Sequence, residues 1–145
     1  ATNERFIPYV VETSAGADRI TLVVMLDAYH EDDVEGEKRV VLRLHPTLAP
    51  LKAAVFPLVN KDGMPELARR IFDDLRKHHN VFHDDGGSIG RRYRRQDEAG
   101  TPFGITIDGQ STQDGTVTVR DRDTLKQIRL AADRLAGYLA ERLRG

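Results

Sequence analysis

The chain has 145 residues, a formal charge of −1 and no cysteine; 39% of its residues are hydrophobic and 31% are charged. This length and balance suit one folded domain with an appendage from a neighbouring domain, and they exclude an intrinsically disordered chain. Without cysteine there is no disulfide, thiolate metal site or cysteine nucleophile. The longest mainly apolar run, Ile20–Leu26, is too short to span a bilayer and no signal peptide is visible, so we expect a cytoplasmic protein with no membrane partner.

The first 30 residues predict a strand, a turn and a helix. The strand is expected over Phe6–Val11, the turn over Glu12–Arg19 and a helix of about three turns over Ile20–Tyr29. Because the helix is apolar nearly all round from Ile20 to Leu26, we expect a larger body to bury it. The chain also opens at Ala1 without an initiator methionine. We therefore expect this segment to come from a longer protein.

An acidic stretch, His30–Lys38, follows and is predicted to be flexible. His30 and Glu31 begin like the zinc motif H-E-x-x-H, but Val34 stands where the second histidine would be. The other histidines lack ligand spacing as well. We therefore expect no metal site.

A domain boundary is expected at the proline-bracketed linker His45–Pro50, which follows a predicted strand over Arg39–Leu44. This divides the chain into residues 1–45 and 46–145. The second part alternates strands with helices, which predicts an α/β fold: a mixed sheet of about five strands flanked by three helices, preceded by a strand and a helix. Its predicted elements are strands over Lys52–Val59, Val81–His83, Phe103–Ile107, Thr116–Arg122 and Lys126–Leu130, helices starting at Pro65, after Ser88 and through Leu135–Leu143, and a turn over Gly109–Gly115.

One predicted helix is rich in arginine. Gly86 and Gly87 lead into Ser88, whose side-chain oxygen we expect to cap the helix. Arginine forks match phosphate oxygens, and arginine and tyrosine stack on bases, so this helix predicts a nucleic-acid surface beyond the strand ends. The alternative is a solvated helix face with arginines paired to nearby acids. The helix carries Arg91, Arg92, Tyr93, Arg94 and Arg95, and the acids are Asp84, Asp85, Asp97 and Glu98.

Three motifs occur in a fixed order along the chain: E-T-S-A-G-A-D-R (Glu12–Arg19), L-A-P-L-K-A-A-V-F-P-L (Leu48–Leu58), and D-D-G-G-S-I-G-R-R-Y-R-R-Q-D-E-A-G-T-P-F (Asp84–Phe103) with T-V-T-V-R-D-R-D (Thr116–Asp123). Together they resemble the C-terminal part of the glycyl-tRNA synthetases, a family of class II aminoacyl-tRNA synthetases. The resemblance covers essentially the whole chain. The first motif points to glycine, whereas the arginine motif is shared more loosely by synthetases for threonine, proline and histidine.

The resemblance implies a glycine and nucleotide site in the first motif. A glycine pocket needs a carboxylate for the ammonium group and small walls that exclude a side chain, which suits these residue types. A cation in the first turn of a helix opposes the macrodipole, so Arg19 is easier to explain if it holds ATP. Otherwise these are surface residues, with Arg19 paired to Asp18 or Asp27. The implied glycine-binding residues are Glu12, Ser14 and Gly16, and the implied ATP-binding residues are Gly16, Asp18 and Arg19; the family usually has proline where this chain has Thr13.

The resemblance also implies an anticodon-binding surface. Strand alternation puts Arg120 and Arg122 on one face and Asp121 and Asp123 on the other. Because arginine reads guanine and aspartate reads the cytosine amino group, either face could discriminate bases. The implied tRNA-binding residues are Arg91, Arg92, Tyr93, Arg94, Arg95, Arg120 and Arg122.

The resemblance implies that the parent protein attaches glycine to tRNA(Gly) with ATP and Mg²⁺, as a homodimer joined through the catalytic domain. The 145-residue chain alone is expected to be inactive and to hold no cofactor. One alternative is a non-catalytic, synthetase-like accessory module that binds nucleic acid. Another is an α/β domain for small molecules, but the chain has no G-x-G-x-x-G, P-loop or G-x-S-x-G motif.

Overall fold

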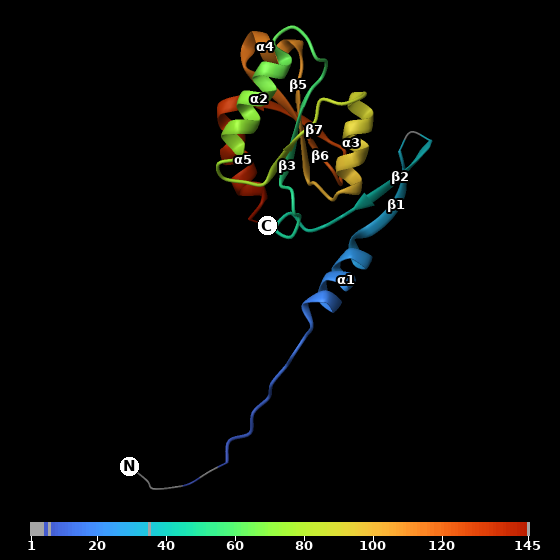
Figure 1. Cartoon of the computed structure of the whole chain (residues 1–145), viewed down its shortest axis with the longest axis vertical. Helices are drawn as coiled ribbons and strands as arrows, with labels where there is room; N and C mark the ends of the chain where they lie inside the picture. The colour runs from blue at the N-terminus through green and yellow to red at the C-terminus, as the bar shows by residue number, and fades with distance from the viewer. Residues whose placement is uncertain (1–4, 6, 35, 145) are drawn as a thin grey trace.

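The computed structural model describes residues 5, 7–34 and 36–144. In Figure 1, a rounded body holds the main sheet, and residues 7–16 with α1 project away from it. The helices are α1 (Ala17–Ala28), α2 (Met64–Leu75), α3 (Ile89–Glu98), α4 (Gly109–Asp114) and α5 (Leu135–Arg142), the last preceded by a 3₁₀ turn at Ala132–Arg134. The strands are β1 (Tyr29–Val34), β2 (Glu37–Leu42), β3 (Ala53–Pro57), β4 (Val81–His83), β5 (Phe103–Ile107), β6 (Thr116–Asp121) and β7 (Gln127–Ala131).

The main sheet has five strands in the order β4-β3-β5-β6-β7. β3 runs parallel to both β4 and β5, because α2 and α3 provide the crossovers that parallel strands require. β6 and β7 are antiparallel to their neighbours and need only short connections. The predicted α/β fold with a mixed five-stranded sheet is confirmed, with α2, α3 and α5 as the predicted flanking helices.

The two faces of this sheet differ in chemistry. Phe103, Ile105 and Ile107 of β5 point to one side and pack with α2 and α5 in the main hydrophobic core. We call this side the apolar face. Each fully buried residue of this kind contributes about 1.5–3 kcal/mol through the hydrophobic effect. The opposite side, which we call the polar face, presents Ala54, Phe56, Gly104, Thr106, Thr118, Arg120, Gln127 and Arg129, which share registers across β3, β5, β6 and β7.

The acidic stretch predicted to be flexible is instead an antiparallel hairpin of β1 and β2. Tyr29 pairs with Leu42 at its base and Val34 with Glu37 near its tip. Gly36 has a φ of 83°, and its N–H donates to the Asp33 carboxylate at 2.8 Å. Glycine permits this left-handed turn, and the aspartate fixes it. The prediction failed because the acidic residues obscured a turn signal.

The segment predicted as a turn over Gly109–Gly115 contains α4. Asp108 caps it: the Asp108 carboxylate accepts from the Ser111 N–H at 2.9 Å, and the Asp108 N–H donates to the Ser111 hydroxyl at 3.0 Å. This reciprocal capping box satisfies two backbone groups and stabilises one short helical turn. Gly115, with φ of 68°, ends the helix.

The strand predicted over Phe6–Val11 is absent from the described part of that segment, and Phe6 lies outside the described residues. Ile7 and Val11 are irregular and fully exposed, at 91% and 93%. A strand needs a hydrogen-bonding partner, and none lies beside this segment in the described part of the chain. The helix prediction is confirmed by α1, although Ala28 is its one buried residue. No helix among the described residues is long and apolar enough to cross a membrane.

Candidate nucleic-acid interface

The arginine-rich helix α3 is set between two glycine turns. Gly87, with φ of 78°, precedes it, and Gly100, with φ of 77°, follows it. Ser88 occupies the N-cap position with an extended backbone, but its side chain makes no capping hydrogen bond, so that detail of the prediction was wrong. At the other end the Thr101 hydroxyl donates to the Gln96 side chain at 2.7 Å. These turns place α3 across the polar face of the sheet.

Tyr93 fixes α3 to the polar face. Its ring meets Phe56 edge-on, with centroids 5.2 Å apart, and its hydroxyl lies 2.6 Å from the Thr106 hydroxyl. A Cβ on Gly104 would lie 2.4 Å from the ring, so this glycine allows the close approach. The Arg120 guanidinium stacks 4.6 Å from the ring centroid. Burial raises the pKa of Tyr93, so the phenol is neutral and remains a hydrogen-bond donor.

Beside Tyr93 the polar face is hollowed into a cavity of about 250 Å³. We call it the polar groove. α3 covers β3 and β5 but leaves the polar side chains of β6 and β7 accessible, so the groove floor is rich in donors and acceptors. Its walls are Leu58, Ile89, Tyr93, Thr106, Asp108, Thr118 and Gln127.

A carboxylate–guanidinium pair lies at one end of the polar groove. Burial opposes ionisation of Asp108, but hydrogen bonds from Ser111 and Arg129 outweigh it and lower the pKa of this carboxyl. Arg129 also donates to the Thr116 hydroxyl at 2.7 Å. Sequence reasoning missed Asp108, Gln127 and Arg129. The available signal was the polar residues at alternate positions of β7, which place Gln127 and Arg129 on the same face.

Two of the predicted RNA-binding arginines are buried. Arg92 is 3% exposed and donates to the carbonyls of Pro57, Asp85 and Gly87. Arg122 is 2% exposed, donates to the Gly100 and Leu44 carbonyls at 2.7 and 2.8 Å, and pairs with Asp123. Both guanidinium groups tie loops together by satisfying carbonyls. Neither side chain has the accessible surface that contact with RNA requires.

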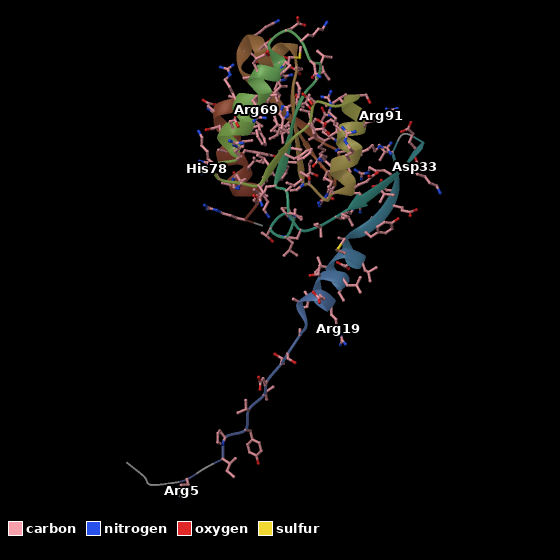
Figure 2. The ribbon with its side chains drawn as sticks, viewed as in Figure 1. Arg5, Arg19, Asp33, Arg69, His78 and Arg91 are labelled. Carbon is pink, nitrogen blue, oxygen red and sulfur yellow. The ribbon has the colours of Figure 1, made fainter. Side chains whose placement is uncertain are left out.

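The other arginines of α3 lie at the surface. Arg94 pairs with Glu37 at 2.7 Å, and Arg95 pairs with Asp84 at 2.6 Å. Burial opposes ionisation of Asp84, but hydrogen bonds from Arg95 and the Gly86 N–H lower its pKa. Arg91 is exposed at the outer side of α3 and makes no hydrogen bond or ion pair with another described residue (Figure 2). It is therefore available to a ligand.

The predicted pairing of arginines with nearby acids is partly seen. Asp84 pairs within the segment, through Arg95. Asp97 instead binds two arginines from elsewhere, Arg39 of β2 and Arg120 of β6. Neither Asp85 nor Glu98 forms a side-chain ion pair among the described residues.

The residues predicted to bind glycine and ATP are all exposed. Glu12, Ser14 and Gly16 lie in irregular chain, and Asp18 and Arg19 lie in the first turn of α1. Within the described residues, none of their side chains makes a hydrogen bond or ion pair, including the Arg19 pairs considered above. Figure 2 shows Arg19 well away from the body. In this chain the five residues do not assemble into a pocket that would fit glycine or a nucleotide. No group of side chains suited to a metal ion is found within residues 5, 7–34 and 36–144.

The fold and the polar groove define a class: a mixed α/β domain with a groove of polar side chains on one face of its sheet. A solved structure, prolyl-tRNA synthetase from Cryptosporidium parvum complexed with halofuginone and AMPPNP, shares this fold with a TM-score of 0.66 and 19% identity, over 71% of this chain and 22% of that one. The family model described as "Anticodon binding domain" matches residues 52–142. The chain belongs to the anticodon-binding domain family.

Curated relatives confirm the resemblance stated from the motifs. The glycine–tRNA ligase of Rhodopirellula baltica is 55% identical over 99% of this chain and 28% of its own length. That of Geobacillus thermodenitrificans is 57% identical over 98% of this chain and 30% of its own length. That of Corynebacterium glutamicum is 52% identical over 99% of this chain and 32% of its own length. The chain thus spans about 30% of the length of these relatives.

Proposed function

We propose that this chain is the part of a glycine–tRNA ligase that completes the catalytic domain (residues 1–45) and binds the tRNA anticodon (residues 46–145). The observation that carries the proposal is the polar groove beside Tyr93. A cavity of about 250 Å³ with donors and acceptors on its floor suits a single flat base better than a larger ligand. The family match, which begins at residue 52, supports the proposed boundary.

The groove and the exposed arginines have separate tasks in this proposal. Gln127 and the ionised Asp108 carboxylate suit the edge of a base, because amides and carboxylates discriminate base amino and carbonyl groups. Arg91 and Arg95 lie outside the groove and suit backbone phosphates, which give affinity but little sequence selectivity. Arg92 and Arg122 act indirectly, by holding the loops around the site.

The catalytic part of the proposal requires residues beyond this chain. In the parent enzyme, Glu12, Ser14 and Gly16 would bind glycine, while Gly16, Asp18 and Arg19 would bind ATP, used with Mg²⁺. Because these side chains are exposed and unassembled, no step of glycine activation is derived from them. The homodimer and the cytoplasmic location belong to the same proposal.

Binding of a tRNA(Gly) transcript, followed by fluorescence anisotropy at several salt concentrations, tests the anticodon-binding role. Gln127→Ala should weaken binding about 10-fold and reduce discrimination against a transcript with an altered anticodon. Arg91→Ala should weaken binding of both transcripts alike and lower the salt slope by roughly 0.7–0.9, the value of one phosphate contact.

Arg70→Ala is the matched control, because Arg70 is an exposed arginine of α2, on the apolar-face side of the sheet. It should leave affinity and salt slope unchanged. If Gln127→Ala and Arg91→Ala both bind like the wild type, or if the wild type does not distinguish the two transcripts, the proposed function fails.

A further inference from the structure

Asp97 joins two separate parts of the molecule. It lies near the end of α3, is 2% exposed, and its Oδ2 accepts from Arg39 Nη1 of β2 at 3.2 Å. The same carboxylate accepts two bonds from Arg120 of β6, at 2.9 and 3.0 Å. One buried carboxylate is therefore shared by the β1–β2 hairpin and the polar face of the main sheet.

On the hairpin side, the Arg39 guanidinium is held by several hydrogen bonds. Arg39 is 2% exposed and forms two bonds to the Asp32 carboxylate, at 2.8 and 2.5 Å. Its Nη1 also donates to the Arg122 carbonyl at 2.9 Å. Arg39 thus spans from its own hairpin to α3 and to the end of β6. A buried charge with this many partners holds one orientation, since each alternative leaves a polar group unsatisfied.

On the other side the contacts continue into the polar groove. Arg120 stacks on the Tyr93 ring, and Tyr93 bonds Thr106. Tyr93 and Thr106 both line the groove. The contacts Arg39–Asp97–Arg120–Tyr93 therefore run without interruption from the hairpin to the groove wall; we call them the Asp97 relay. Arg39 itself is too buried to touch an RNA.

A second contact between the hairpin and α3 provides a comparison. Arg94 donates to Glu37 and to the Lys38 carbonyl, both at 2.7 Å, but it joins the same two elements at the surface and does not reach Tyr93. Glu37 is 79% exposed, so solvent screens this pair. It helps dock the hairpin without contacting the groove.

We propose that Asp97 is a positioning residue that couples docking of the β1–β2 hairpin to the conformation of the RNA groove. The proposal rests on the proposed function for its ligand. When an RNA base occupies the groove, it fixes the Tyr93–Arg120 stack. Because Asp97 binds both Arg120 and Arg39, the position of Arg39 and of the hairpin is restrained as well. Helix α1 leads directly into β1 of the hairpin. A base bound in the groove therefore also restrains the segment that carries Asp18 and Arg19.

The first experiment needs no RNA. The whole chain is labelled with ¹³C-tyrosine, and its four tyrosines report separate places by NMR. Arg39→Met keeps Asp97 paired with Arg120 but removes the hairpin restraint, so the Tyr93 ring resonances should shift. Tyr138, on the apolar face, should not. Glu37→Gln, which breaks the surface ion pair with Arg94 from the hairpin side, should leave the Tyr93 resonances unchanged.

The second experiment adds an anticodon stem-loop RNA. Arg39→Met should weaken RNA binding about 10-fold, within the usual range of coupling between sites. Glu37→Gln should weaken it less than twofold, because the pair that it breaks is screened by solvent. In the wild type, RNA should slow hydrogen exchange of the β1 and β2 amides, and this slowing should be lost in Arg39→Met. Arg39→Lys, which keeps the charge but not the fork, should bind RNA with intermediate affinity.

The outcomes separate the two proposals. If wild-type RNA binding is absent, the proposed function fails, and the Tyr93 shift still decides whether the relay exists. An unchanged Tyr93 spectrum in Arg39→Met, or unchanged affinity with unchanged hairpin exchange on RNA addition, overturns the coupling. Should Arg39→Met not fold, the same measurements are made on Arg39→Lys, with Glu37→Gln as its control.

Discussion

The apolar and polar faces of the main sheet are built from alternate residues of the same strands, yet they have opposite roles. On the apolar face, Ile105 and Val119 are covered by α2 and α5 and are nearly fully buried. On the polar face, their neighbours Thr106 and Thr118 line the polar groove. Stability is concentrated on one face, and the surface available to a ligand is concentrated on the other.

The comparison teaches that the polar face, besides apolar contacts such as Phe56 with Tyr93, buries charged groups that depend on hydrogen bonds and ion pairs. Arg92 and Asp97 are as buried as core residues, but each is held by several polar partners. Burying such charged groups costs free energy, which is offset only when their hydrogen bonds and ion pairs have good geometry. The polar face is therefore specific in conformation and sensitive to small changes in shape.

The largest expected effect is on the apolar face. Ile105→Ala should lower the free energy of unfolding by about 2–5 kcal/mol, because it opens a cavity in a closely packed core. Urea denaturation measures this. The folded fraction should bind RNA as the wild type does, since Ile105 lies away from the groove. Ile128→Ala, at a 42% exposed position of β7, is the control and should cost less than about 1 kcal/mol. Ile128 pairs with Val119 on the same face, so equal losses in the two variants would mean that burial does not concentrate stability in the core of the apolar face.

A smaller effect is expected on the polar face at Gly104. Gly104→Ala places a Cβ 2.4 Å from the Tyr93 ring, so it should destabilise the fold by about 1–3 kcal/mol. It should also weaken RNA binding, because Tyr93 must shift into the polar groove. The matched change Gly137→Ala lies in α5 with open space around it, and it should stabilise by about 0.5–1 kcal/mol. Thermal unfolding and anisotropy measure both, and an RNA affinity unaffected by Gly104→Ala would argue against the groove.

The smallest effect concerns the hairpin that docks beside the polar face. The hydrogen bond from Arg39, with a further one from Arg43, lowers the pKa of Asp32 from 3.8 to about 2. Because the pKa of Asp32 is lower in the folded state, its ionised form stabilises the fold above pH 3.8, and this stability is lost as the pH falls towards 2. Asp32→Asn should therefore be less stable than the wild type at pH 5, by about 1 kcal/mol or less because the pair is partly exposed, and the difference should shrink by pH 2.5. Urea titrations at the two pH values measure this; a constant difference would mean that Asp32 is not held by Arg39.

Much of the fold followed from the sequence because its signals are local. β4 and β5 have the predicted bounds, and α2 begins beside Pro65, which suits the first helical turn. β2 lies close to the strand predicted over Arg39–Leu44. β1, the hairpin turn and α4 were missed because their signals are side chains that bond nearby backbone, Asp33 to Gly36 and Asp108 to Ser111. The isolated strand over Phe6–Val11 failed for the opposite reason: its apolar pattern is present, but a pairing partner is not among the described residues.

The candidate site was only partly predictable. α3 and Tyr93 were identified from composition and spacing, and Arg91 is exposed as the nucleic-acid interpretation requires. Gln127 and Arg129 reach the same face only because β7 pairs with β6 in a particular register. That register depends on contacts between strands, which a single sequence does not display.

The sequence by itself determined the order of the five strands of the main sheet and of the helices α2, α3 and α5, together with the arginine-rich character of α3 and the family. These follow from periodicity and motifs, which are properties of neighbouring residues. The tertiary structure decided which charges are structural and which are available. Arg91 and Arg92 are adjacent in α3, yet one is exposed and the other is 3% exposed among three carbonyls. Arg39 and Asp97 are 58 residues apart in sequence and meet only in the folded chain. A helix turns about 100° per residue, so the role of each side chain depends on what the fold packs against that side.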